Sequence, residues 1–278
     1  MSPSANLPTE PPDNPPACDC HFHVFSADES AADARYVPTY SAKLRDWETH
    51  AQDSGVQRGV VVQPSFLGTD NRQLLQALRQ RPLTLRGVAV VAPTATEAEL
   101  RELHKGGVRG VRLNLMGARD DVGALQALPA SWWSALMAVG MHLELHADAG
   151  RVAVLLPMVP QGLTVVLDHF AKPDRIDTQD DTVRAVGDRR HSPGATYVTL
   201  SGAYRQTAAN RPICRELALL WLEELSPDHL LWGSDWPCTN FETEADYAAL
   251  IGVLRAWLPQ TADHQAALAA NAQTLYWC

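Results

Sequence analysis

Two histidines spaced two residues apart, His21 and His23, lie in a short apolar run near the start of the chain, A-C-D-C-H-F-H-V-F at residues 17–25. The run has the composition of a buried strand, whose side chains alternate between two faces. Asp19, His21 and His23 are therefore expected on one face, and the neighbouring cysteines on the other. Burying two imidazoles without partners costs free energy. The pair therefore indicates a face that opens into a pocket, unless both are satisfied core histidines.

Polar or ionisable side chains recur at the carboxyl ends of the other predicted strands. These candidates are Gln63, Ser65, Arg112, Asn114, Glu144, His146, His169, Ser201, Arg205 and Asp235. Asp168 is expected to face away from His169 and to be structural. Three alternatives stay open: Arg112 pairs with a carboxylate inside the fold, His146 is a core histidine, and Asp235 caps a turn.

The chemistry that these residue types can perform together is hydrolysis. Histidines bind a divalent metal or donate hydrogen bonds to a carbonyl oxygen. An aspartate such as Asp235 can take a proton from water as a general base. Arginines bind carboxylates through two parallel hydrogen bonds. A serine nucleophile is less supported, because no G-x-S-x-G segment occurs.

Stretches rich in Val and Leu alternate with stretches of helical composition along the chain. The predicted strands span residues 17–25, 58–65, 85–91, 108–115, 141–147, 163–170, 195–201 and 229–235. The predicted helices span residues 42–54, 71–80, 96–105, 131–139, 152–158 and 211–224, with two more in residues 243–275. Eight strand–helix units in 278 residues favour an α/β fold, a closed (β/α)8 barrel of the TIM type, over an open doubly wound sheet. Catalytic groups of such barrels lie at the carboxyl ends of the strands.

The domain organisation follows from composition. Residues 1–16 are rich in Pro, Asn and Ser and are expected to form a short disordered tail. Residues 17–278 are expected to form a single catalytic barrel. Residues 174–194 have no clear assignment. No Gly-rich dinucleotide or P-loop motif occurs.

Charge and cysteine content restrict the partners. The net charge of −9 argues against nucleic-acid binding but permits a locally basic pocket for an anionic ligand. Five scattered cysteines without a C-x-x-C pair indicate reduced thiols in a cytoplasmic protein and argue against a cysteine zinc site. No apolar run approaches the ~18 residues of a membrane-spanning helix. We expect a small anionic substrate and no membrane partner. A homo-oligomer stays possible from the sequence.

Several motifs, taken together, resemble the amidohydrolase superfamily and, within it, the 2-pyrone-4,6-dicarboxylate hydrolase branch with its lactonase relatives. The motifs are D-C-H-F-H-V-F (19–25), V-Q-P-S-F-L-G-T-D-N (62–71), G-V-R-G-V-R-L-N-L (107–115), L-D-H-F-A-K-P (167–173), L-S-G-A-Y-R (200–205) and L-W-G-S-D-W-P (231–237). The resemblance covers nearly the whole chain after the tail. The motifs are specific for the branch and not for one substrate.

The resemblance implies hydrolysis of a lactone ester. In this interpretation Asp235 activates the water, while His21, His23 and His169 polarise the lactone carbonyl and stabilise the oxyanion. The residues expected to bind the substrate and its carboxylates are Tyr36, Ser65, Arg112, Asn114, Arg119 and Arg205.

Two features depart from the branch. Lys172 stands where the pyrone hydrolases are expected to carry an arginine, and only Arg119 follows the strand at 108–115 as a further arginine. His146, with Glu144, stands where metal-binding members of the superfamily add a ligand. The resemblance to the pyrone hydrolases implies work without metal and thus no obligatory cofactor, whereas His146 leaves one weakly held metal open. If one divalent metal such as zinc is bound, the expected ligands are His21, His23, His146, His169 and Asp235.

Three hypotheses follow. The first is a lactonase for a small carboxylated lactone, with pyrone dicarboxylate as the first substrate to test and sugar lactones as the second. The next is a metal-dependent decarboxylase of the same superfamily. The third is a non-catalytic barrel that binds a carboxylate ligand. The presence of Asp235 together with four barrel histidines favours the first.

Overall fold

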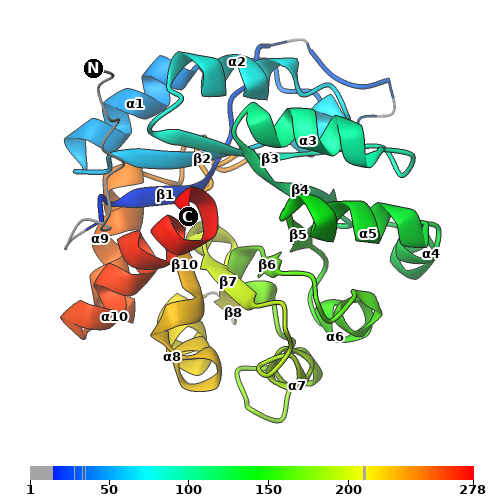
Figure 1. Ribbon diagram of the computed structural model, residues 1–278. Coiled ribbons are helices and arrows are strands. Elements are labelled where there is room, and N and C mark those ends of the chain that lie inside the picture. The colour runs from blue at the N-terminus through cyan, green and yellow to red at the C-terminus, as the bar shows by residue number, and fades with distance from the viewer. Residues whose placement is uncertain (1–14, 28, 33, 35, 209–210) are drawn as a thin grey trace, which may run out of the picture.

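Eight parallel strands form the centre of the molecule in the order β1 to β7 and then β10 (Figure 1). The structure is a computed structural model, and it describes residues 15–27, 29–32, 34, 36–208 and 211–278. The strands are β1 (Cys18–Phe22), β2 (Arg58–Val62), β3 (Leu85–Ala89), β4 (Val108–Asn114), β5 (His142–His146), β6 (Val165–Leu167), β7 (Thr196–Leu200) and β10 (Leu230–Trp232). A separate short hairpin pairs β8 (Thr207–Ala208) with β9 (Arg211–Pro212).

The barrel closes where the segment after β10 meets β1. The amide of Asp235 donates to the carbonyl of His21 at 2.8 Å, and the amide of His23 donates to the carbonyl of Trp236 at 2.8 Å. These bonds continue the parallel ladder past the last regular strand residue. The predicted (β/α)8 barrel is therefore confirmed. Residues 1–14 of the predicted tail lie outside the described residues.

Helices surround the strands on the outside of the barrel (Figure 1). They are α1 (Leu44–Asp53), α2 (Arg72–Gln80), α3 (Glu97–Lys105), α4 (Asp121–Gln126), α5 (Ala130–Val139), α6 (Val152–Leu155), α7 (Asp181–Asp188), α8 (Cys214–Leu225), α9 (Tyr247–Trp257) and α10 (Thr261–Gln265). Helix α7 occupies part of the unassigned segment 174–194, and α4 was not predicted. In the part of the chain that the structure describes, no helix is long and apolar enough to cross a membrane.

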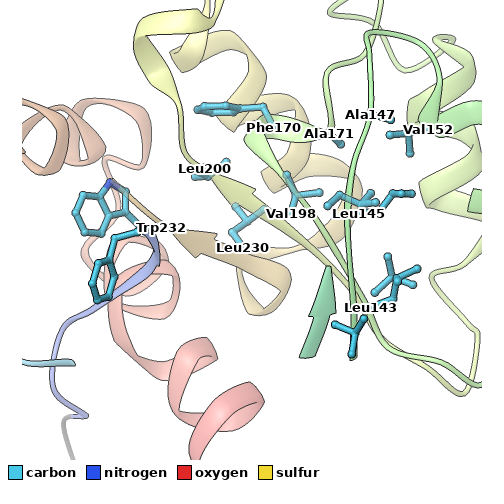
Figure 2. Packing of buried hydrophobic residues seen from close by; sticks show 14 of the residues in the cluster. Leu143, Leu145, Ala147, Val152, Phe170, Ala171, Val198, Leu200, Leu230 and Trp232 are labelled. Carbon is cyan, nitrogen blue, oxygen red and sulfur yellow. The ribbon is translucent and has the colours of Figure 1, made fainter. Parts of the chain in front are cut away.

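Apolar side chains fill both faces of the strands. Outward-facing residues such as Leu143, Val198 and Leu230 pack with the helices (Figure 2). A second, inner cluster fills the barrel itself. It consists of strand residues and two residues of the C-terminal segment: Cys18, Cys20, Val60, Val62, Val88, Val166, Tyr197 and Leu231, with Ala272 and Tyr276. Burial on both faces explains why the strands read as continuous Val- and Leu-rich runs.

The prediction that Asp19 shares a face with His21 and His23 is wrong, because β1 is irregular. Its register against β2 shifts between Asp19 and Phe22, as at a β-bulge. The Asp19 carboxylate consequently faces the surrounding helices, where it accepts hydrogen bonds from Trp47 Nε1 at 2.9 Å and from the Tyr247 hydroxyl at 3.0 Å.

Asp168 also differs from expectation, since it faces the barrel interior rather than away from His169. Strand β6 ends at Leu167, and the backbone from His169 to Lys172 turns into the left-handed region, with φ between 45° and 61°. Val166 faces the barrel interior, and Asp168, two residues later, therefore faces the interior as well. The left-handed turn then brings His169 inward beside it. Gln63, expected to face the pocket, instead donates to the carbonyls of Gly68 and Asp70.

Asp19 generates a prediction about stability. Its fully buried carboxylate also accepts from the amide and hydroxyl of Ser234, at 2.8 and 2.6 Å. Asp19→Asn puts an NH2 group among these donors and leaves some of them unpaired, each at a cost of roughly 1–3 kcal/mol. We expect the free energy of unfolding in urea to fall by about 3 kcal/mol.

Asp46→Asn, on the exposed face of α1, is the matched control. It is expected to change the free energy of unfolding by less than about 0.5 kcal/mol. Equal effects of the two substitutions would show that the Asp19 contacts do not hold β1 against its neighbours.

Candidate active site

A cavity of about 930 Å³ lies at the carboxyl ends of the strands. Among the described residues, its wall carries one acidic residue, Asp235, together with the histidines His23, His146 and His169. Four cationic side chains also line it: Arg112, Arg119, Lys172 and Arg205. The excess of positive charge suits a small anion.

Asp235 lies at the centre of this group and is itself buried. Its Oδ1 is 3.3 Å from His23 Nε2 and 3.7 Å from His21 Nε2, and its Oδ2 is 3.9 Å from His169 Nε2. Burial raises the pKa of Asp235, but the surrounding histidines, His169 first and then His23 and His21, lower it well below its usual range. Asp235 is therefore ionised at neutral pH.

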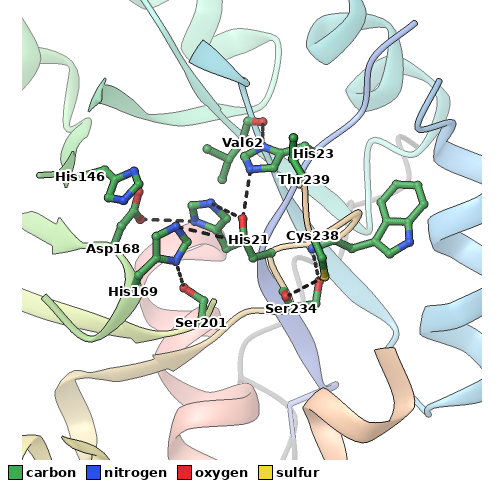
Figure 3. A network of polar contacts seen from close by, with 12 residues as sticks. His21, His23, Val62, His146, Asp168, His169, Ser201, Ser234, Cys238 and Thr239 are labelled. Atoms are coloured by element: carbon green, nitrogen blue, oxygen red, sulfur yellow. Dashed lines mark hydrogen bonds and ion pairs between the residues drawn. The ribbon is translucent and has the colours of Figure 1, made fainter. Parts of the chain in front are cut away.

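The hydrogen bonds of His23 fix its tautomer. Its Nδ1 lies 2.8 Å from the carbonyl oxygen of Val62 (Figure 3). Because a carbonyl only accepts, Nδ1 carries a proton, and Nε2 is left to face Asp235. Burial lowers the pKa of His23, so this Nε2 is unprotonated at neutral pH. Two proton acceptors, His23 Nε2 and Asp235 Oδ1, thus converge on the cavity.

His169 is held from the other side. Its Nδ1 lies 2.8 Å from the hydroxyl of Ser201 at the end of β7 (Figure 3). The Ser201 contact leaves Nε2 directed at Asp235 and the cavity. Burial lowers the pKa of His169 to about 3, so its ring is neutral at neutral pH.

His21, in contrast, does not line the cavity and lies buried beneath Asp235. Its Nδ1 is 3.3 Å from Asp168 Oδ1 and 3.7 Å from Glu144 Oε1. Burial lowers the pKa of His21, but Asp168 and Glu144 outweigh burial and raise it to about 9. His21 is therefore an imidazolium at neutral pH, placed under the Asp235 carboxylate.

Arg112 pairs with carboxylates inside the barrel, the alternative that the sequence left open. Its Nη2 donates to Asp168 Oδ2 at 2.8 Å, and its Nε is 3.1 Å from Glu144 Oε1. The residue still borders the cavity although only 4% of its surface is exposed. Burial raises the pKa of Glu144 to about 8, with Asp168 adding to the rise.

His146 contacts two cations. Lys172 Nζ lies 2.9 Å from its Nε2, and Arg112 Nη2 lies 3.3 Å from its Nδ1. Burial, and after it the charges of neighbouring groups such as Arg112 and Lys172, lower the pKa of His146 well below its usual range. Its neutral ring accepts at only one nitrogen, so the shorter contact, with Lys172, is the hydrogen bond.

The remaining predicted substrate-binding residues all lie on the cavity wall. They are Tyr36, Ser65, Asn114, Arg119 and Arg205. The Arg205 guanidinium lies over the rings of Tyr204 and Phe241, 4.9 and 4.6 Å from their centroids, and donates to the carbonyl of Thr239 at 2.7 Å. Its Nε is 3.5 Å from Asp235 Oδ2.

Sequence reasoning missed Tyr204. Its hydroxyl donates to Asp235 Oδ2 at 2.5 Å, the shortest contact of that carboxylate. Tyr204 lies two residues after Gly202, whose φ of 61° starts the turn after β7. The sequence does show Tyr204 beside Arg205 in the motif L-S-G-A-Y-R. The direction of the Tyr204 side chain depends on the turn at Gly202, which strand periodicity does not predict.

One divalent metal such as zinc would find suitable donors here. Ligand atoms of His21, His169 and Asp235 lie within 4.8 Å of one another, and His21 Nε2 has no hydrogen-bond partner in the described structure. Their number and type fit such an ion. His146 groups instead with Asp168 and His169, and its Nε2 already accepts from Lys172.

Known proteins resemble the chain over almost its whole length. The sequence profile of the amidohydrolase family matches residues 18–277. A 2-pyrone-4,6-dicarboxylate hydrolase from Comamonas testosteroni is 30% identical, over 94% of this chain and 90% of that protein. A 4-sulfomuconolactone hydrolase from Rhizobium radiobacter is 26% identical, over 94% of this chain and 89% of that protein.

A solved structure agrees with the sequence comparisons. The putative 2-pyrone-4,6-dicarboxylic acid hydrolase from Pseudomonas putida is 35% identical and superposes with a TM-score of 0.84, covering 94% of this chain and 97% of the other. The barrel, the ring of histidines around Asp235 and these relatives lead to one conclusion. The chain belongs to the amidohydrolase family and is a hydrolase of the lactonase type.

Proposed function

We propose that this enzyme opens a small lactone carrying two anionic groups, with 2-pyrone-4,6-dicarboxylate as the leading substrate. The observation that carries the proposal is the charge of the cavity wall: among the residues that the structure describes, four cationic side chains line it together with one carboxylate, Asp235. The relatives named for pyrone dicarboxylate and sulfomuconolactone support it, since both names denote anionic lactones.

Asp235 and His23 activate the water in this mechanism. A water on the cavity side of Asp235 Oδ1 and His23 Nε2, which are 3.3 Å apart, gives up a proton to this pair as its oxygen attacks the lactone carbonyl. The low pKa of Asp235 makes it a weak base, so the barrier must fall mainly through stabilisation of the oxyanion.

The oxyanion is stabilised by His169 and by the positive charge beneath it. His169 Nε2 donates to the carbonyl oxygen when Ser201 donates to Nδ1. The His21 imidazolium offsets the negative charge that builds up beside Asp235. When the tetrahedral intermediate collapses, the ring ester C–O bond breaks and the leaving oxygen takes the proton held by the Asp235–His23 pair.

The substrate's anionic groups bind at two places. Arg205, beside Asp235, holds one of them. Lys172 and Arg119 hold the other, because neither has a carboxylate within ion-pair distance in the described structure. Burial lowers the pKa of Lys172, and a bound anion favours its charged form.

If a divalent ion is bound, His21, His169 and Asp235 would hold it, and it would polarise the lactone carbonyl as a Lewis acid. We propose that turnover proceeds without it, because His169 Nε2 can donate a hydrogen bond to the lactone carbonyl in its place.

The first test is hydrolysis of 2-pyrone-4,6-dicarboxylate, followed through the loss of its ultraviolet absorbance, with and without a chelator. We expect turnover that survives the chelator, and Asp235→Asn is expected to lower kcat by about 10²–10⁴-fold because the base is lost. Exposed Asp228→Asn is the matched control and should keep full activity.

Turnover that survives Asp235→Asn would refute Asp235 as the base. Turnover abolished by the chelator and restored by zinc would instead make His21, His169 and Asp235 metal ligands. Without turnover of the pyrone, 4-sulfomuconolactone and a panel of sugar lactones would be tested next.

The pKa of His21 predicts the alkaline limb of the pH profile. His21 is protonated below about pH 9, so kcat should fall as the pH rises through about 9. Asp168→Asn removes the largest contribution that raises this pKa, and should move the limb to lower pH. The pH–rate profiles of the wild type and of Asp168→Asn test this prediction. If the alkaline limb lies at the same pH in both, His21 does not control the alkaline limb.

Lys172 is expected to determine substrate affinity rather than rate. Lys172→Met keeps the alkyl stem but removes the positive charge, and should raise KM about tenfold or more with a smaller change in kcat. Lys172→Arg should restore part of the affinity, since arginine also binds anions. Exposed Lys105→Met, on α3, is the control. Unchanged KM in Lys172→Met would place the second anionic group elsewhere.

A further inference from the structure

Three arginines gather at the amino-terminal mouth of the barrel, opposite the cavity. Arg58 is the first residue of β2, and Arg86 and Arg109 are the second residues of β3 and β4. These strands are neighbours in the sheet. The C-terminal segment, red in Figure 1, lies over this end of the barrel and places Trp277 among the arginines.

Two of the three guanidinium groups contact the same aromatic ring, and the charge of the third acts on Arg86. The guanidinium carbons of Arg58 and Arg86 lie 4.6 and 5.0 Å from the centroid of the Trp277 ring. Within the described residues, the hydrogen bonds of the three arginines go only to uncharged acceptors: the carbonyls of Pro82, Leu85, His104, Val108 and Tyr276 and the side-chain amide of Gln273.

None of these three arginines forms an ion pair with a carboxylate of the described residues. Exposed arginines such as Arg72 and Arg101, in contrast, do have acidic partners. Burial lowers the pKa of Arg86 to about 10, and the charges of Arg109 and Arg58 add to this. All three are therefore cations at neutral pH that repel one another.

Each arginine also keeps donors for a ligand. The Nη2 group of each has no hydrogen-bond partner in the part of the chain that the structure describes. Guanidinium groups match tetrahedral oxyanions and carboxylates geometrically. An oxyanion with three or four oxygens can accept from three guanidiniums at once, whereas a carboxylate has only two oxygens.

We propose that Arg58, Arg86 and Arg109 form a binding site for a phosphate-type oxyanion, separate from the active site. Such an anion would relieve the repulsion among the three cations and hold β2, β3 and β4 against the C-terminal segment. The ligand is either inorganic phosphate or the phosphoryl group of a metabolite. The inference does not depend on the lactone substrate, because the two sites lie at opposite ends of the strands.

The test is the melting temperature of the full chain in phosphate against chloride at equal ionic strength, with Kd measured by calorimetry. Phosphate should raise the melting temperature of the wild type, as a ligand of the folded state does. Arg86→Met and Arg109→Met should each weaken phosphate binding about tenfold or more. Arg79→Met, an exposed arginine of α2, is the matched control and should bind normally.

Two further variants locate the bound anion. Lys172→Met, in the active-site cavity, should leave phosphate binding unchanged, and Trp277→Phe should abolish any fluorescence change that phosphate produces. Comparison of inorganic phosphate with glycerol phosphate distinguishes the free ion from a phosphoryl group as the ligand. If Arg86→Met does not fold, Arg109→Met still decides the question.

Three outcomes would overturn the proposal. Equal affinity of the wild type and both arginine variants would show that phosphate binds elsewhere. Loss of binding in Lys172→Met would place it in the active-site cavity. Self-association of the wild type that Arg86→Glu abolishes, without a phosphate effect, would show that a second copy of the chain covers the arginines.

Discussion

The compensation of charge inside the barrel is the constraint on which the site depends. Asp235, Asp168 and Glu144 are 4%, 2% and 1% exposed, and an isolated carboxyl group buried to this degree would take up a proton. Burial raises the pKa of Asp168, but His21 and Arg112, which lie among the three groups, lower it well below its usual range. Glu144, in contrast, keeps a raised pKa of about 8. The ionisation of Asp235 depends on His169 and His23 in the cavity wall and on His21 one layer deeper, which substrate does not touch.

The same few residues close the barrel and build the site. After β10, Ser234 faces outward to Asp19 and the next residue, Asp235, faces inward to His21 and His23. In β1, the bulge lets Asp19 face the helices while both histidines face the interior. A change that loosens this seam would therefore be expected to affect stability and catalysis together.

Much of this arrangement was predictable from periodicity. Alternation along β5 correctly placed Glu144 below His146, and the same alternation brought Asp235 to the cavity above Gly233. The eight strands and their order followed from the repeated alternation of strand and helix composition. The strands depend on regular backbone, for which the period of the sequence pattern is also the period of the side-chain directions. Asp235 lies beyond the end of β10 and has a φ of 60°, so its agreement with alternation is not explained by regular strand geometry.

The remaining features depend on irregular backbone or on long-range contacts. The bulge in β1 reversed the face of Asp19, and the left-handed turn after β6 brought His169 inward beside Asp168. Neither leaves a periodic signal. The pairing of Arg112 with Asp168 joins residues 56 positions apart, so only the folded barrel reveals that this arginine is largely neutralised before any substrate arrives.

The turn at His169–Lys172 has a consequence for how the enzyme can evolve. Four successive residues with side chains adopt positive φ values, each at a cost of roughly 1–2 kcal/mol relative to ordinary backbone. Glycine would remove the cost, but at His169 and Lys172 it would also remove an imidazole and an ammonium group from the cavity wall. Selection for thermal stability and selection for turnover therefore oppose each other at these two positions. Ala171 does not line the cavity, so a substitution there is selected for its effect on stability alone.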